Sequence, residues 1–195
     1  LVRLENETLS IGERVLAQGL QLTVRGQEKI GIIGPNGVGK STLLAKLQQL
    51  LSDKREISLG FMPQDYQETL QLDLSPVEFL SQTGHKEEIQ KIQSHLASLN
   101  FSYPEMHHQI HSLSGGQQGK LLLLNLVLRK PNFLLLDEPT RNFSPTSQPE
   151  IRKLFANYSG GLVTVSHDRR FLKEVCTSIY SLTEHGLEVV DLQDL

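Results

Sequence analysis

A glycine-rich loop between a strand and a helix is the feature that most constrains how this chain folds. An apolar run at residues 29–33 leads into the loop, and leucines recur at helical spacing beyond it. The loop fits the pattern G-x-x-x-x-G-K-[ST] at every specified position. Its residues are Gly34, Pro35, Asn36, Gly37, Val38, Gly39, Lys40 and Ser41. A strand-turn-helix unit with this loop predicts a phosphate-binding site rather than an accidental glycine turn.

The chemistry expected of the loop follows from its residue types. Glycines let backbone N–H groups turn toward phosphate oxygens, and the helix from Lys40 directs the positive end of its dipole at the same anion. We expect Lys40 to reach the β- and γ-phosphates of a nucleotide and the Ser41 hydroxyl to bind Mg²⁺. Thr42 is expected to contact the α-phosphate.

Two adjacent carboxylates follow a second apolar strand. Residues 133–136 are all apolar, as in strands buried in a parallel sheet, and Asp137 and Glu138 come directly after them. Ligands of parallel sheets bind at this end of the strands. We expect Asp137 to hold Mg²⁺, mostly through water, and Glu138 to act as the general base on an attacking water. Without the phosphate loop upstream, two acids would indicate only the start of a loop.

The order of the segments predicts an α/β fold in one domain covering residues 1–195. Strands and helices alternate through the centre, which favours a core with a parallel sheet, expected over residues 31–75 and 113–195. Residues 1–30 read as a small antiparallel β part, and the polar residues 76–112 as a small helical subdomain. Ser147 and Glu150 have the spacing of a capping box and predict a helix start there.

Composition excludes several classes of protein. The net charge of −3 gives no global attraction to nucleic acid or to an anionic membrane. No apolar run approaches the roughly 20 residues that span a bilayer, so we expect no membrane span and a cytoplasmic location. The only cysteine, Cys176, excludes an internal disulfide and is interpreted as a small buried hydrophobe. Because the first residue is Leu rather than Met, we expect a fragment of a longer protein.

Three further motifs establish a resemblance to a known family. Gln64, after an expected strand, resembles the Q-loop glutamine of ABC proteins, and His167 resembles their switch histidine. The ABC signature sequence is matched by Leu113, Ser114, Gly115, Gly116 and Gln117. With the phosphate loop and the carboxylate pair, five motifs stand in family order, and the resemblance to an ABC nucleotide-binding domain covers essentially the whole chain.

The resemblance implies an ABC-type P-loop NTPase core, ATP and Mg²⁺ as ligands, and ATPase activity that is weak in the isolated domain. It implies catalytic roles for Glu138, His167 and Gln64, with His167 bonded to the γ-phosphate. Gln64 is also expected near the metal, together with Ser41 and Asp137. The signature residues, which start a helix, would cover ATP held by a second ABC domain, from the same parent chain or from a second copy.

A narrower resemblance points to the ABC-F branch. Residues 137–140, 165–172 and 62–66 are similar to that group, whose members are soluble, carry two ABC domains in one chain and act on ribosomes. They serve as translation factors or as antibiotic-resistance proteins, and the sequence leaves that choice and the drug class open. The close of the chain resembles a C-terminal ABC domain.

Two other functions stay open at this point: the ATPase subunit of a membrane transporter, and a regulatory nucleotide switch with little turnover. Residues 104–112 favour ABC-F, because transporter ATPases carry an acid- and glycine-rich coupling segment there.

The chain departs from the family pattern at two places. No aromatic residue precedes Phe61, so Ile11 or the stem of Arg14 would cover the base, and the preference between ATP and GTP stays open. The family's Asn-His-Leu-Asp after Thr140 is replaced by residues 141–144, which places Ser144 where an aspartate helps position water. We expect this change either to slow hydrolysis at one site or to mark a site used for binding more than for turnover.

Two groups of charged or metal-binding side chains are interpreted as solvated surface. His107, His108 and His111 lack a cysteine or a well-placed carboxylate to complete a zinc site. The dispersed basic pairs at residues 129–130, 152–153 and 169–170 would contact RNA only through backbone phosphates.

Overall fold

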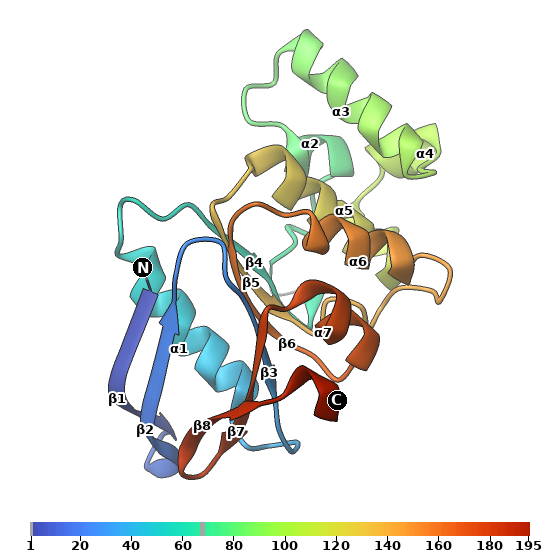
Figure 1. The fold of residues 1–195 in the computed structure, drawn as a ribbon. Coiled ribbons are helices and arrows are strands. Elements are labelled where there is room, and N and C mark those ends of the chain that lie inside the picture. The colour runs from blue at the N-terminus through green and yellow to red at the C-terminus, as the bar shows by residue number, and fades with distance from the viewer. Residues whose placement is uncertain (1, 67–68) are drawn as a thin grey trace. The chain divides into compact units, whose positions relative to one another are not determined.

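The computed structural model describes residues 2–66 and 69–195, which form two compact units. The first unit holds the chain up to Gln64 together with Pro131–Arg141 and Pro145–Leu195. The second unit holds Asp65–Lys130 and Asn142–Ser144. Figure 1 labels the elements of both.

A six-stranded sheet in the order β4-β5-β6-β3-β7-β8 organises the first unit. Five of its strands are parallel and β8 is antiparallel to β7, which confirms the predicted α/β fold with a parallel sheet. The strands are β3 (Lys29–Ile33), β4 (Leu59–Met62), β5 (Phe133–Asp137), β6 (Gly161–Val165), β7 (Ser178–Thr183) and β8 (Gly186–Val190). Every residue of β5 and β6 is buried, as expected for strands covered on both faces.

The N-terminal β part is a separate two-stranded antiparallel sheet of β1 (Val2–Ile11) and β2 (Arg14–Val24). Alternation along these strands buries apolar side chains such as Leu4, Leu9 and Leu22 in the core of the first unit. The predicted antiparallel β subdomain is therefore confirmed.

Helices α1 (Lys40–Ser52), α6 (Gln148–Ala156) and α7 (Arg169–Val175) belong to the first unit, with a 3₁₀ turn at Leu192–Asp194. Helix α1 buries leucines spaced three or four residues apart, including Leu43, Leu47 and Leu51. Cys176, which follows α7, is buried as expected, and burial raises the pKa of its thiol to about 12.

The start of α6 differs from the expectation. The helix begins at Gln148, but Ser147 has αR backbone geometry and its side chain makes no cap hydrogen bond, so the predicted capping box is wrong. An N-cap residue normally lies in the extended region, which aims its side chain at the first-turn N–H groups. Helix α6 lacks that geometry.

The second unit is helical. Its elements are α2 (Pro76–Leu80), α3 (Lys86–Ser98), α4 (Tyr103–His107), a 3₁₀ turn at Ile110–Ser112 and α5 (Gly115–Arg129). Capping boxes begin α2, α4 and α5, at Ser75, Ser102 and Ser114. The segment expected to be helical, residues 76–112, lies inside this unit, which also includes α5. Within the described residues, no helix has both the length and the apolar character that crossing a bilayer requires.

Candidate functional site

A cleft of about 840 Å³ lies in the first unit. It is lined by residues at the ends of strands β5 and β6 and by the loop that follows β3. Its volume falls within the roughly 300–1,000 Å³ of typical ligand pockets. It is also at the carboxyl ends of parallel strands, the usual ligand side of an open α/β sheet. The phosphate loop and first turn of α1 contribute Asn36, Gly37, Gly39, Lys40, Ser41 and Thr42 to its walls.

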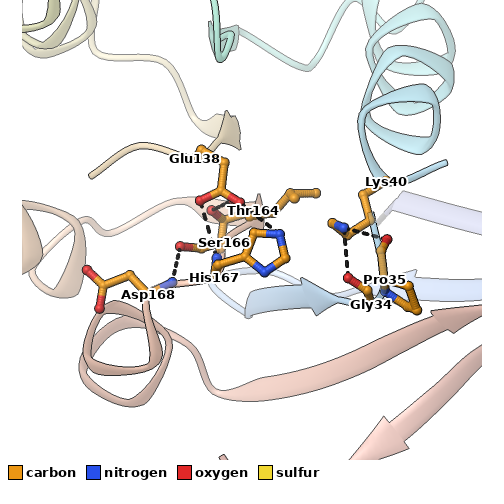
Figure 2. A network of polar contacts seen from close by, with 9 residues as sticks. Gly34, Pro35, Lys40, Glu138, Thr164, Ser166, His167 and Asp168 are labelled. Atoms are coloured by element: carbon orange, nitrogen blue, oxygen red, sulfur yellow. Dashed lines mark hydrogen bonds and ion pairs between the residues drawn. The ribbon is translucent and has the colours of Figure 1, made fainter. Parts of the chain in front are cut away.

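Lys40 is held at the base of the loop. Its side chain is buried, and its ammonium donates hydrogen bonds to the carbonyl oxygens of Gly34 at 2.8 Å and Pro35 at 2.9 Å (Figure 2). Burial lowers the pKa of Lys40, and the negative charges of Glu138 and Asp137 oppose that shift. Gly34 and Pro35, both predicted to touch phosphate, thus orient the lysine through their carbonyls.

Gly39 sets the geometry at the start of α1. Its φ of 107° is left-handed, and a Cβ there would lie 2.8 Å from Leu16 Cδ1 and 2.9 Å from Leu9 Cδ2. Only glycine fits, for both conformational and steric reasons. The residue before it, Val38, packs against the core. The β1–β2 sheet therefore fixes the loop that turns the N-terminus of α1 toward the cleft.

Asp137 and Ser41 meet beside this loop. Asp137 is the last residue of β5 and only 6% exposed. Burial raises the pKa of its carboxyl group, while a hydrogen bond from Ser41 and the positive charges of Lys40 and Arg141 lower it. A buried carboxylate next to a hydroxyl offers the oxygen ligands that Mg²⁺ prefers.

Glu138 has a left-handed backbone, with φ of 50°. Its N–H donates to the Val165 carbonyl at 2.9 Å, and its Oε2 accepts the His167 N–H at 3.2 Å. The second carboxylate oxygen lies 3.6 Å from His167 Nε2 (Figure 2). Burial raises the pKa of Glu138. A non-glycine residue kept in this conformation is strained, and such strain is concentrated at functional sites.

The predicted catalytic and metal residues lie in one cleft. Glu138 and His167 line it, as does the exposed Gln64 after β4. Ser41 and Asp137, the other predicted metal ligands, line it as well. The structure brings these side chains together, and their individual roles stay predictions.

Sequence reasoning missed several lining residues. Thr140 and Arg141, from the loop after β5, line the cleft, and so do Gln148, the first residue of α6, and Asp168, which follows His167. Asp168 also caps α7, because its Oδ1 accepts the N–H groups of Arg170 at 2.9 Å and Phe171 at 3.0 Å. The position of Thr140 and Arg141 directly after Asp137 and Glu138 would have indicated these two residues, because that loop starts at the same end of the strand.

The structure separates the two residues considered for covering the base. Within the part of the chain that the structure describes, Ile11 lines the cleft and Arg14 does not. Ile11 is 59% exposed, so its apolar side chain is accessible to a ligand in the cleft.

The signature residues begin α5 in the second unit. The Ser114 Oγ accepts the Gln117 N–H at 3.3 Å, and Gln117 Oε1 accepts the Ser114 N–H at 3.0 Å. Gln117 also donates to Glu105 Oε1 at 2.7 Å. Ser114 and Gly115 are exposed, and a Cβ on Gly115 would meet no atom of the described residues within 4 Å. The open space beside Gly115 gives another molecule close access to the backbone at this helix start.

The three histidines ahead of the signature also lie in the second unit. The His107 ring lies 4.5 Å from the Tyr103 ring, and its Nε2 is 3.1 Å from Gln93 Nε2. His108 and His111 are exposed. Among residues 2–66 and 69–195, no three His, Cys, Asp or Glu side chains form a group suited to a metal ion.

Comparison with known proteins decides the family. The family model described as "ABC transporter" matches residues 17–141. The chain belongs to the ABC transporter family. The predicted ATPase domain of this family is therefore confirmed, with its phosphate loop and carboxylate strand inside the matched region.

The relatives of this cassette include ABC-F proteins. It is 30% identical over 198 residues to the "Probable ATP-binding protein YheS" of Escherichia coli strain K12, covering 98% of this chain and 31% of the relative. It is 29% identical over 195 residues to "ABC transporter F family member 2" of Arabidopsis thaliana, covering 96% and 29%. It is 31% identical over 193 residues to the "Ribosome protection protein VmlR" of Bacillus subtilis strain 168, covering 96% and 35%.

The resemblance to the ABC-F branch is thus confirmed, although the cassette spans only about a third of the length of these relatives. Among solved structures, the fold matches the dimeric ATP-binding cassette MJ0796 in a post-hydrolysis state bound to ADP and Pi. The TM-score is 0.78 at 20% identity, covering 98% of this chain and 99% of that one. The predicted ABC fold class is therefore confirmed.

Proposed function

We propose that this cassette binds ATP with Mg²⁺ in the cleft of the first unit, hydrolyses it, and works in an ABC-F protein that acts on the ribosome. The observation that carries the proposal is the convergence of Lys40, Ser41, Asp137, Glu138 and His167 on one cleft. Lys40 and Ser41 begin α1, after the loop that follows β3, and the other three residues lie at or just after the ends of β5 and β6. Together they provide a phosphate-binding cation, oxygen ligands and a base.

The residues present fit both ligands. The Lys40 ammonium and the positive end of α1 neutralise the β- and γ-phosphates, while Thr42 contacts the α-phosphate. Ser41, Asp137 and Gln64 supply oxygen atoms to the metal. When bound, Mg²⁺ neutralises charge on the phosphate oxygens.

Hydrolysis uses the pair formed by Glu138 and His167. Water attacks the γ-phosphorus, the bond to the ADP oxygen breaks, and the Glu138 carboxylate accepts the proton of the water. Burial, which raises the pKa of Glu138, makes the carboxylate a stronger base than an exposed glutamate. His167 donates to the γ-phosphate and, through its backbone N–H, holds the carboxylate in place.

A second cassette completes the proposed reaction. The exposed N-terminus of α5, with Ser114 and Gly115, covers ATP held by that partner, which is another domain of the parent chain or a second copy. Closure around ATP and opening after hydrolysis then form a clamp. The ribosomal role, and with it the cytoplasmic location, is supported by the similarity to ABC-F proteins and to a ribosome protection protein.

The hydrolytic part is tested with Glu138→Gln, which keeps size and removes the base. We expect the rate of phosphate release to fall by roughly 10²- to 10⁴-fold with ATP affinity retained. Wild-type turnover should decline as the pH falls through the pKa of Glu138, which lies above the ordinary glutamate value because of burial. Glu150→Gln, at an exposed position outside the cleft, is the matched control and should turn over normally. Equal rates for Glu138→Gln and the control would contradict the base assignment.

The ribosomal part is tested with Glu138→Gln in the full-length protein that contains this cassette. The variant is sedimented with purified ribosomes and, separately, with membranes, each with and without ATP. We expect ATP-dependent sedimentation with ribosomes. Sedimentation with membranes alone would instead indicate a transporter partner.

A further inference from the structure

The loop after β5 turns an arginine back toward the two carboxylates. The Arg141 N–H donates to the Glu138 carbonyl at 3.1 Å, which closes a four-residue turn. Pro139 restricts φ at the second position of the turn, and Thr140, at the third, is only 3% exposed. The turn is therefore held from within, and the exposed Arg141 side chain lines the cleft with Lys40 and Asp137.

Arg141 is available to a ligand. Among the described residues that line the cleft, only Lys40 and Arg141 are lysine or arginine. The ammonium of Lys40 already donates hydrogen bonds to the carbonyl oxygens of the loop. None of the ion pairs between described residues includes Arg141.

The position of Arg141 indicates which part of a nucleotide it meets. Ile11, on β1, is the lining residue that we expect to cover the base, whereas Arg141 shares a tight turn with Glu138, the proposed general base in hydrolysis at the γ-phosphate. A guanidinium offers a planar fork of donors that matches two phosphate oxygens at once. The family pattern described above has asparagine at this position, and this chain has Arg141 instead.

We propose that Arg141 binds the terminal phosphate of the nucleotide and thereby makes the cassette prefer a nucleoside triphosphate over a diphosphate. This inference rests on the proposed binding of ATP in the same cleft. A purely local role, in which Arg141 only keeps Asp137 ionised as a ligand of Mg²⁺, would act through the metal site and would vanish when Mg²⁺ is removed.

The test compares ATP and ADP affinities by isothermal titration calorimetry, with Mg²⁺ and again in EDTA. We expect Arg141→Ala to weaken ATP binding roughly tenfold and ADP binding less than about twofold, in both buffers, because it loses charge-assisted bonds to one phosphate. Arg141→Lys should fall between, since it keeps the charge and loses the fork. Arg55→Ala removes an exposed arginine outside the cleft and should match the wild type.

Each other outcome overturns the inference. Equal weakening of ATP and ADP, or no weakening, shows that Arg141 does not distinguish the terminal phosphate. Weakening with Mg²⁺ alone shows that it acts through Asp137. These results leave the proposed function intact provided that the wild type binds ATP and Lys40→Ala does not. A wild type that binds no nucleotide overturns both proposals. Thermal unfolding of each variant checks that the fold is kept.

Discussion

Helices α1 and α5 both begin at glycine-containing motifs, yet their N-termini are built in opposite ways. Helix α1 follows left-handed Gly39, and no described side chain caps its first turn. Helix α5 follows Ser114, and a complete capping box provides acceptors for the N–H groups of Gln117 and Ser114. The first-turn N–H groups of a helix need acceptors from outside the helix. Among the described residues, the first turn of α1 has no side-chain cap, whereas the first turn of α5 has one.

This difference assigns different partners to the two helix starts. At α1, the Lys40 cation and the two carboxylates of the cleft surround the N-terminus, so a metal–nucleotide complex binds there in our proposal. At α5, the exposed backbone at Gly115 leaves room for a phosphate held by another cassette. In our proposal, this second site binds phosphate only when another cassette is present.

Replacing Lys40 should have the largest effect on nucleotide binding at the start of α1. We expect Lys40→Ala to weaken ATP binding at least about a hundredfold, because charge-assisted bonds to two phosphates are lost. The measurement is calorimetric titration with ATP. Lys46→Ala is the control: Lys46 lies on the same helix but pairs with Glu7 at 2.6 Å, outside the cleft. The phosphate-loop assignment is lost if the two variants bind ATP equally well.

A negative charge at Gly115 should separate helix stability from partner binding at α5. An acidic side chain in the first turn stabilises a helix by a few tenths of a kcal/mol through its interaction with the helix dipole. The free energy of unfolding of Gly115→Asp should therefore not fall. The same charge repels a phosphate, and we expect ATP-dependent association of two chains to weaken about tenfold.

Sedimentation velocity with ATP measures the association, together with the rise of specific ATPase activity with protein concentration. Specific activity that stays constant down to high dilution would show that no partner is needed. Gln90→Glu, at an exposed position of α3 in the second unit, controls for the added charge in this assay.

The smallest expected effect is at Ile11, which we expect to cover the base. It tests whether the site at the start of α1 binds mainly the phosphates of the nucleotide. Ile11→Tyr adds a ring that can stack on a purine, worth about 0.5–1.5 kcal/mol, so we expect ATP and GTP to bind roughly three- to tenfold more tightly. Val15→Tyr, on β2 and outside the lining, should change neither affinity. Unchanged binding in Ile11→Tyr would mean that the base does not reach this residue.

The helix starts also show where sequence prediction succeeds and fails. The start of α1 at Lys40 was predictable, because the loop motif determines the backbone from Gly39 onward. Ser147 had the spacing of a capping residue, yet its αR backbone prevents the cap. The spacing of residues shows which side chains could cap a helix. Contacts with the surrounding structure set the backbone dihedral angles that direct those side chains.

The sequence by itself determined the local chemistry: a strand, a phosphate loop and a helix, two acids after an apolar strand, and the family to which they belong. Those features depend on residues close together in the chain, where backbone propensity and motif chemistry act. Only the tertiary structure decided that Arg141, Asp168 and Ile11 share the cleft with Lys40. Their meeting depends on β3, β5 and β6 lying next to one another, with β1 and β2 packed into the same core. The pairing of these strands arises because segments far apart in the sequence are buried together. No local sequence pattern specifies which strands become neighbours.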